Sequence, residues 1–375
     1  MYHSQLKVAV ALAAIGAIAL AGCANKASTA TAPATSTSSA AAAGSTQPAG
    51  GSTPSGSAPS VSSTPDLTIM VGGMSKQIYL PYMLAKQLGY YAKAGVNVNL
   101  IDEPAGGDAT TNMLAGQVQG VGGFYDHTIV LQGKGKATES VVSMLRNPGE
   151  VELCRTDLKG TVKSPADFKG RSLGITDTGS STDFLTQYLT FKAGVDPAAT
   201  TRRGVGAGQT FLAAMKQKAI DCGMTTEPTV SQAVSTGVAY VLLDTRGAGA
   251  KTYLGGEYPA TSLYMTTDYV NSHKALVQKL VNAYVATLKW IQGHNGTQIA
   301  DAMPASYYAG VGKAAYAKAL DSEKAIFNPD GLMPATGPAT CLAVLSAFNP
   351  AVKGKTIDTK KTFTDEFVTA AAPIS

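Results

Sequence analysis

The 375-residue sequence is poor in the residue types on which many enzymes and metal sites depend. It has four cysteines, four histidines and one tryptophan, and only 15% of its residues are charged. It contains no C-x-x-C motif and no His/Cys cluster, so we expect no metal site. The formal net charge of +5 is small for this length, and lysine and arginine are scattered along the chain. We therefore expect no nucleic-acid partner.

The sequence also lacks the motifs of common catalytic sites. The run Gly179-Ser180-Ser181-Thr182 has no glycine two residues beyond a serine, so it is not a nucleophile elbow. Gly206 and Gly208 lack the remaining spacing and the following acid of a dinucleotide-binding loop. Asp126 and His127 could form an acid/base pair, but adjacent side chains point in different directions, which favours binding or packing. We predict no catalytic residue, no cofactor and no enzyme activity.

The N-terminus has the features of an export signal. Val8 to Ala19 is an apolar run preceded by Lys7, and it is too short for a comfortable membrane span. It ends in Leu20-Ala21-Gly22-Cys23, which resembles a bacterial lipobox. Residues 1–23 are therefore interpreted as a lipoprotein signal peptide with Cys23 as the lipidation site, and an uncleaved anchor is the alternative. The expected location is the extracytoplasmic face of the cell membrane, which is periplasmic if the cell has an outer membrane.

The segment that follows, residues 24–65, is almost entirely Ala, Ser, Thr, Pro and Gly. Such a composition cannot bury enough apolar surface to offset the entropy lost on ordering, so we predict a disordered tether. Three cysteines follow it, Cys154, Cys222 and Cys341. They allow at most one disulfide with one cysteine left over, and the sequence does not choose the pair.

From Asp66 onward, short apolar runs alternate with helical patterns, which is typical of an α/β protein with parallel sheets flanked by helices. We assign residues 66–160 to a first lobe and residues 161–255 to a second lobe. Residues 256–375 then return to the first lobe and form C-terminal helices. Two hinge crossings are expected, near residues 156–165 and 250–262.

In open parallel sheets, the loops beyond the carboxyl ends of the strands line the ligand crevice. The clearest example is the strand Leu173 to Ile175, which is followed by a polar turn and a helix that starts at Ser180 to Thr182. Free N–H groups and the helix dipole make such a start a site for a carboxylate, sulfonate or phosphate. The candidate ligand-binding residues are Ser75, Tyr79, Gly107, Tyr125, Asp126, Ser180, Ser181, Thr182, Gln209 and Glu227.

Within this set, Tyr79 and Tyr125 are expected to give apolar contact, and Glu227 or Asp126 to take a positive group of the ligand. Two of these assignments have purely structural alternatives. A serine at the helix start, Ser180 or Ser181, can be a helix N-cap. Glu227 can be a first-turn acid that complements a helix dipole.

Several stretches resemble the nitrate, sulfonate and taurine branch of the ABC-importer substrate-binding proteins, in the NMT1/THI5-like family. They are Leu88-Gly89-Tyr90-Tyr91 with Ala94-Gly95-Val96, Leu114 to Val118, Asp167 to Ile175, and Glu227-Pro228. The resemblance implies a two-lobed periplasmic-binding-protein fold of type II-like form that holds a small polar organic solute, sulfonate- or taurine-like, between its lobes. It also implies an ABC permease and its ATPase as partners, and we expect a monomer.

Three other functions stay open. The ligand could be a thiamine-precursor pyrimidine or another nitrogen heterocycle, which the same family also binds. A THI5-like enzyme is disfavoured, because resemblance to it would require a cysteine-rich iron motif. A sensing or adhesion lipoprotein without an importer is the third. Nitrate itself is doubtful as the ligand, because Tyr125-Asp126-His127-Thr128 is more polar than a simple inorganic anion requires.

Overall fold

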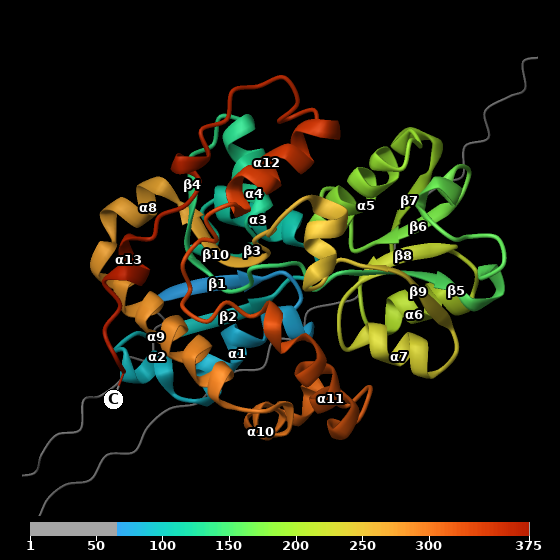
Figure 1. The fold of residues 1–375 in the computed structure, drawn as a ribbon. Helices are drawn as coiled ribbons and strands as arrows, with labels where there is room; N and C mark the ends of the chain where they lie inside the picture. Colours follow the sequence, from blue (N-terminus) through green and yellow to red (C-terminus); the bar gives the residue numbers. More distant parts are fainter. Residues whose placement is uncertain (1–65, 375) are drawn as a thin grey trace, which may run out of the picture. The chain divides into compact units, whose positions relative to one another are not determined.

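The computed structural model describes residues 66–374, so the predicted signal peptide, Cys23 and the tether lie outside the described residues. The described chain forms two five-stranded sheets with helices packed on their faces (Figure 1). Among residues 66–374, no helix is both long and apolar enough to cross a membrane.

The first sheet has the strand order β2-β1-β3-β10-β4. β2 and β3 run parallel to β1, whereas β10 is antiparallel to both of its neighbours, β3 and β4. β10 carries the chain back into this lobe from the second lobe, in agreement with the predicted return of residues 256–375. The strand bounds are β1 (Leu67–Val71), β2 (Val98–Asp102), β3 (Gly120–Phe124), β4 (Thr138–Ser143) and β10 (Thr261–Thr266).

Alternating residues of β1 build the two cores of this lobe, because successive side chains of a strand point to opposite faces. Ile69 and Val71 pack with α1 (Leu80–Gln87) and α9 (Lys274–Gly293). Met70 packs on the other face, with Met113 of α3 (Gly106–Leu114). α9 is one of the expected C-terminal helices, and its apolar side is buried. The remaining helices here are η1 (Gln77–Tyr79), α2 (Tyr90–Lys93), α4 (Asp126–Gly133), α8 (Thr267–Ser272), α10 (Gly296–Ala302), η6 (Ala305–Tyr307), α11 (Lys313–Glu323), η7 (Lys324–Ile326), α12 (Gly337–Phe348), η8 (Thr359–Lys361) and α13 (Glu366–Thr369).

The second sheet has the order β7-β6-β8-β5-β9, with β5 antiparallel to both neighbours. Phe184 and Leu185 of α5 pack on one face, and Phe211 of α6 and Val230 of α7 pack on the other. The bounds are β5 (Val151–Arg155), β6 (Ser172–Ile175), β7 (Thr201–Gly204), β8 (Cys222–Thr225), β9 (Ala239–Asp244), η2 (Thr156–Leu158), η3 (Pro165–Phe168), η4 (Pro197–Ala199), α5 (Ser181–Lys192), α6 (Gln209–Lys216) and α7 (Thr229–Ser235).

Two expectations about the sheets are corrected here. The sheets are mixed rather than all parallel, because each receives one antiparallel strand, β10 or β5. Since β5 lies inside the second sheet, the chain first crosses at residues 144–150, earlier than the predicted 156–165. Ser164 and Pro165 instead begin the short helix η3, which Ser164 caps. The second crossing covers residues 245–260 and includes the π-helical segment η5 (Ala250–Leu254).

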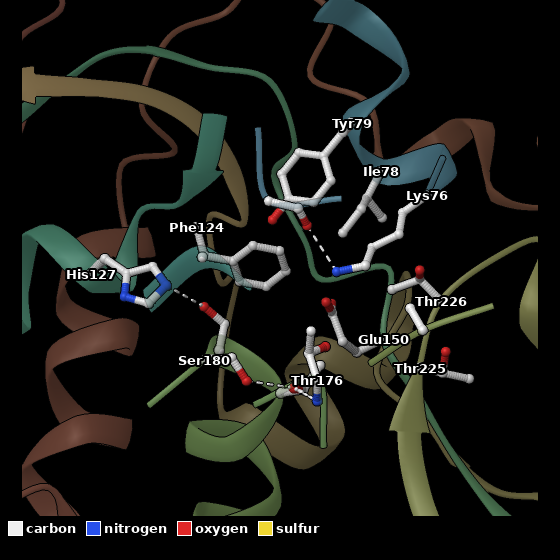
Figure 2. Close-up of a pocket in the computed structure, with 15 residues that line it drawn as sticks. Lys76, Ile78, Tyr79, Phe124, His127, Glu150, Thr176, Ser180, Thr225 and Thr226 are labelled. Atoms are coloured by element: carbon white, nitrogen blue, oxygen red, sulfur yellow. Dashed lines mark hydrogen bonds between the residues drawn. The ribbon is translucent and has the colours of Figure 1, made fainter. Parts of the chain in front are cut away.

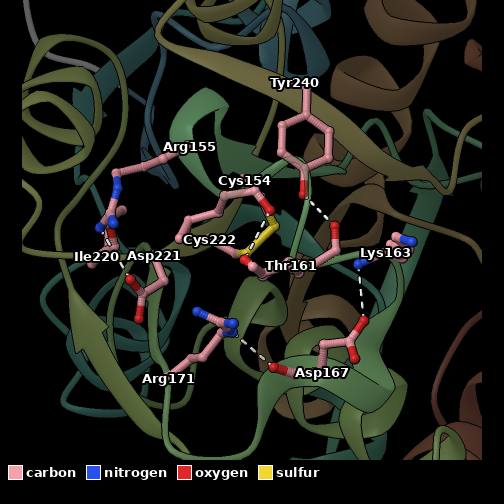
Figure 3. The surroundings of a disulfide bond; sticks show 12 residues. Cys154, Arg155, Thr161, Lys163, Asp167, Arg171, Ile220, Asp221, Cys222 and Tyr240 are labelled. Carbon is pink, nitrogen blue, oxygen red and sulfur yellow. Dashed lines mark hydrogen bonds and ion pairs between the residues drawn. A yellow bond between two sulfur atoms is a disulfide. The ribbon is translucent and has the colours of Figure 1, made fainter.

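Strand pairing also decides which cysteines are joined. Cys154 of β5 lies opposite Cys222 of β8, and the two form a disulfide (Figure 3). Cys341 on α12 is free and buried. The bonded cysteines are 68 residues apart in sequence, so only the sheet topology brings them together.

Candidate functional site

A small cavity lies where the carboxyl ends of β1, β3, β6 and β8 face each other across the two lobes (Figure 2). Its volume of about 20 Å³ is room for about one water molecule. The lining residues combine hydroxyls, apolar rings and charged groups: Gly72, Lys76, Ile78, Tyr79, Gly106, Phe124, His127, Glu150, Thr176, Ser180, Ser181, Thr182, Ala207, Thr225 and Thr226.

The start of α5 forms the second lobe's part of the cavity. Ser180 is the N-cap, and its hydroxyl accepts a hydrogen bond from the Asp183 N–H at 3.3 Å. The Thr182 hydroxyl accepts one from the Thr176 N–H at 2.9 Å. These side chains are therefore already engaged in shaping the turn. Within residues 66–374, the backbone N–H groups of Ser181 and Thr182 have no hydrogen-bond partner, so these two donors are available to an anion.

Ser181 joins this helix start to the first lobe. Its hydroxyl donates to Asp126 Oδ1 at 2.8 Å and lies 3.4 Å from His127 Nε2. Asp126 also accepts a hydrogen bond from the Tyr258 hydroxyl at 2.8 Å. Burial raises the pKa of Asp126 and lowers the pKa of His127. Contrary to expectation, the adjacent Asp126 and His127 side chains flank the same serine, because the first turn of α4 faces the start of α5.

One basic and one acidic residue face the cavity. Lys76 follows β1, and its ammonium donates to the Gly72 carbonyl at 2.8 Å and the Pro104 carbonyl at 3.3 Å. Glu150 immediately precedes β5, is 2% exposed, and its Oε2 has no hydrogen-bond partner among the described residues. Figure 2 shows both side chains reaching toward the same space. A ligand can therefore meet a cation and an acceptor in one small volume.

Burial changes the protonation of both residues. Desolvation lowers the pKa of Lys76 to about 8, although the nearby Glu150 opposes this shift. Desolvation raises the pKa of Glu150 to about 8, which the nearby Lys76 opposes. The cost of holding each charge away from water thus exceeds their mutual attraction. A ligand group that pairs with the charged form of Lys76 or Glu150 will therefore change the protonation of that residue when it binds.

The predicted site residues divide into four groups. Tyr79, Ser180, Ser181 and Thr182 line the cavity. Gly107 lies just outside it, where a side chain would come within 3.6 Å of the Gly179 carbonyl across the lobes. Ser75 and Gln209 line a second cavity of about 230 Å³ near residues 207–209 and 306–311.

The other three predicted residues have structural partners instead. The Tyr125 hydroxyl is hydrogen-bonded to Thr362 in the core. Asp126 lies behind Ser181 and is fully buried. Glu227 precedes α7, accepts from the Ser231 N–H in the first turn of that helix at 2.9 Å and pairs with Arg246 at 3.2 Å. These three side chains do not line the cavity.

Lys76, His127 and Glu150 also line the cavity but are not among the predicted site residues. Lys76 is the residue after the predicted Ser75, and His127 was interpreted with Asp126 as a binding or packing residue. Glu150 was not predicted, because the expectation that ligands meet the carboxyl ends of strands holds for parallel strands. β5 is antiparallel to β8, so its amino end lies beside Thr225 and faces the cleft. An acid directly before a fully buried strand was the available signal.

The arrangement of Ser181, His127 and Asp126 is not that of a nucleophile with its base. In a hydrolytic triad, the acid binds the histidine and the histidine binds the serine. Here the Asp126 carboxylate accepts directly from Ser181 and Tyr258. None of the lining residues is a cysteine, and residues 66–374 contain no cluster of His, Cys, Asp and Glu that could hold a metal ion. The groups present are suited to hydrogen bonding and charge recognition.

Comparison with known proteins agrees with the two-lobed geometry. The NMT1/THI5 like family profile matches residues 77–296, more than half of the chain, so this chain belongs to that family. A solved structure from Bordetella bronchiseptica RB50 shares 32% sequence identity with a TM-score of 0.78, covering 81% of this chain and 96% of that one. No curated protein sequence matched the chain.

More distant solved structures share the fold. The nitrate-binding protein NrtA from Synechocystis PCC 6803 is 18% identical with a TM-score of 0.65, covering 82% of this chain and 88% of its own. The alkanesulfonate-binding protein SsuA from Xanthomonas axonopodis pv. citri, bound to MOPS, is 16% identical with a TM-score of 0.63, covering 80% and 97%. The predicted periplasmic-binding-protein fold is confirmed, and these neighbours are solute-binding proteins.

Proposed function

We propose that this chain is the extracytoplasmic substrate-binding component of an ABC importer, and that its solute is a small zwitterion of the taurine type. The observation that carries the proposal is the presence of one basic and one acidic side chain around the same cavity. The ammonium of Lys76 and the free N–H groups of α5 favour an anionic group, and the unpartnered carboxyl oxygen of Glu150 favours a cationic one.

The apolar part of the lining fits a short linker between two charged groups. Ile78, Tyr79 and Phe124 lie beside the cavity, and each is at most 5% exposed. Similarity to a protein that binds alkanesulfonates supports a sulfonate as the anionic group. A sulfonate has three acceptor oxygens, which can share the two N–H groups and the Lys76 ammonium. An aminoalkyl sulfonate would place its nitrogen toward Glu150.

Binding requires the lobes to separate, because a cavity of about 20 Å³ cannot admit a molecule of this size. The two crossings at residues 144–150 and 245–260 provide the hinge. Contacts such as Ser181 to Asp126 then re-form around the solute, which stabilises the closed form by touching both lobes. The closed protein would dock on the permease, whose ATPase drives release. We further propose that the protein is a monomer, held at the membrane by a lipid on Cys23, and that it catalyses no reaction.

Thermal unfolding of residues 24–375 in the presence of candidate solutes tests this function. A solute that binds only the folded state at a hundredfold excess over Kd should stabilise it by about 2.7 kcal/mol. We expect stabilisation by taurine and a smaller effect of ethanesulfonate, which lacks the amine. Stabilisation by a thiamine-precursor pyrimidine alone would replace this proposal with the heterocycle alternative. No stabilisation by any of them would favour the sensing or adhesion lipoprotein.

Replacement of Lys76 by Met tests the assignment of the anionic group, because methionine keeps most of the apolar stem and removes the charge. We expect taurine to bind at least tenfold more weakly, from loss of a charged hydrogen bond worth about 1.5 to 3 kcal/mol. The matched control is Lys86→Met, since Lys86 is exposed on the last turn of α1 and does not line the cavity. Equal affinity of both variants would remove Lys76 from the site.

A further inference from the structure

Six exposed lysines lie together at one end of the first lobe, on the segments 134–136 and 351–361, which are far apart in the sequence. The segment 351–361 crosses the end of α4, where the Lys355 ammonium donates to the Gly133 carbonyl at 2.6 Å. The Gln132 side chain donates to the Asp358 carbonyl at 2.9 Å. We call the exposed lysines of these segments, with Asp358, the lysine patch: Lys134, Lys136, Lys353, Lys355, Lys360 and Lys361.

The lysine patch holds more positive charge than the described chain as a whole. Two of the 30 Lys and Arg residues and none of the 25 acids precede residue 66, so residues 66–374 have a net charge of +3. Six lysines and one aspartate give the patch +5, which leaves −2 for all the rest. Among the described residues, Lys361 is the one patch lysine whose ammonium lies within 4.0 Å of a carboxylate, that of Asp358. The lysines are therefore largely uncompensated, which corrects the expectation that basic residues are scattered.

The topology of the first sheet places the patch opposite the solute cavity. β4 runs parallel to β1 and β3, because β10 is antiparallel to both β3 and β4. Lys134 and Lys136 immediately precede β4, so they lie at the amino edge of the sheet, whereas the cavity lies at its carboxyl edge. α4 runs between the two edges, from Asp126 beside Ser181 to Gly133 beneath the patch, a length of about 12 Å.

The same amino edge receives the N-terminal part of the chain. β1 begins at Leu67, directly after the predicted tether, and is three strand spacings from β4, about 14 Å. The lysine patch and the tether's point of attachment are therefore at one end of the lobe. We propose that the lysine patch binds the anionic phospholipid head groups of a membrane surface, so that the solute cleft points away from the bilayer. Flexible, exposed ammonium groups suit phosphate head groups, whose negative surface potential attracts lysines within about a Debye length.

Sedimentation of residues 24–375 with lipid vesicles tests this inference without the lipid anchor, and therefore independently of the proposed solute and importer. We expect binding to mixed phosphatidylglycerol/phosphatidylcholine vesicles and none to phosphatidylcholine alone. Binding should disappear at about 1 M salt, where the Debye length falls to about 3 Å. Equal binding to both vesicle types would overturn the proposal. So would equally tight binding to a DNA duplex at the same salt, because the patch would then be a general polyanion site.

Charge-matched variants locate the binding surface. Each lysine removed should weaken binding about fivefold, so a triple variant should lose about a hundredfold. The patch variant is Lys134→Gln, Lys136→Gln and Lys353→Gln; the control, with three exposed second-lobe lysines changed, is Lys159→Gln, Lys169→Gln and Lys216→Gln. Equal losses in the two variants would show an effect of net charge and would overturn the assignment. Unchanged melting temperatures, measured for both, establish that the variants are folded.

Discussion

Replacement of Glu150 by Gln gives the sharpest test of how the cavity distinguishes solutes. Glutamine has almost the same shape and can still accept a hydrogen bond, but it cannot become negative. In the wild type, the carboxyl is buried and its Oε2 is unpartnered, so a solute ammonium would make a charge-assisted hydrogen bond there. Such a bond contributes about 1.5 to 3 kcal/mol once Glu150 is ionised, so above its pKa of about 8 we expect taurine to bind about ten- to a hundredfold more weakly to the variant.

Ethanesulfonate provides the internal comparison, because it has no amine to meet Glu150. The pKa of Glu150 is raised to about 8, so the residue is mostly neutral at about pH 7 and does not repel an anion. We therefore expect the Gln variant to bind ethanesulfonate about as well as the wild type does at that pH. Selectivity for taurine over ethanesulfonate should fall, which isothermal titration calorimetry would measure directly.

The pH dependence of binding supplies a second readout with a definite sign. An ammonium group favours ionised Glu150, so taurine binding must release the proton that Glu150 holds below its pKa of about 8. Wild-type affinity for taurine should rise by up to about tenfold per pH unit between pH 6 and pH 8, and the Gln variant should not show this rise.

The control for these measurements is Glu139→Gln. Burial also raises the pKa of Glu139, but this residue lies at the start of β4, opposite the cleft. It should change neither selectivity nor pH dependence. If Glu150→Gln binds taurine with wild-type affinity and an unaltered pH profile, Glu150 does not contact an ammonium and the zwitterion proposal is wrong.

Three further predictions concern stability and closure. Reduction of the Cys154–Cys222 disulfide, which closes a loop with a sequence separation of 68, should lower the free energy of unfolding by about 4 kcal/mol in denaturant titrations; a loss below about 1 kcal/mol would contradict this. Ser181→Ala removes the hydroxyl that donates to Asp126 across the lobes, so we expect about tenfold weaker taurine binding by calorimetry, and wild-type affinity would exclude this contact from closure. The ligand-free protein should lose thermal stability as the pH rises from about 5 through 8, because the raised pKa of Glu150 means that the folded state holds a proton that the unfolded state releases; Glu150→Gln should reduce that slope, and an unchanged slope would assign it to other groups.

Short-range patterns in the sequence were enough to predict the elements and the class of fold. The period of apolar residues located α9, and the strand, turn and helix start at 172–182 located β6 and the start of α5. These features depend on neighbours along the chain, through side-chain periodicity and N-capping, so they are readable without tertiary structure. The family resemblance extended the same local evidence to the two-lobed fold.

Only the tertiary structure decided features that depend on the direction of a strand or on contacts distant in sequence. The antiparallel insertion of β5 placed Glu150 at the cleft and selected the Cys154–Cys222 pair, and neither follows from local spacing. The lysines near 134 and 355 are scattered in the sequence, because more than two hundred residues separate them. In the structure they lie together, because the C-terminal segment crosses the end of α4. The sequence by itself located the start of α5 and the periodic apolar faces of the helices in the two lobes. The charges around that helix start, and those on the opposite end of the lobe, were decided by the order and direction of strands in the sheets.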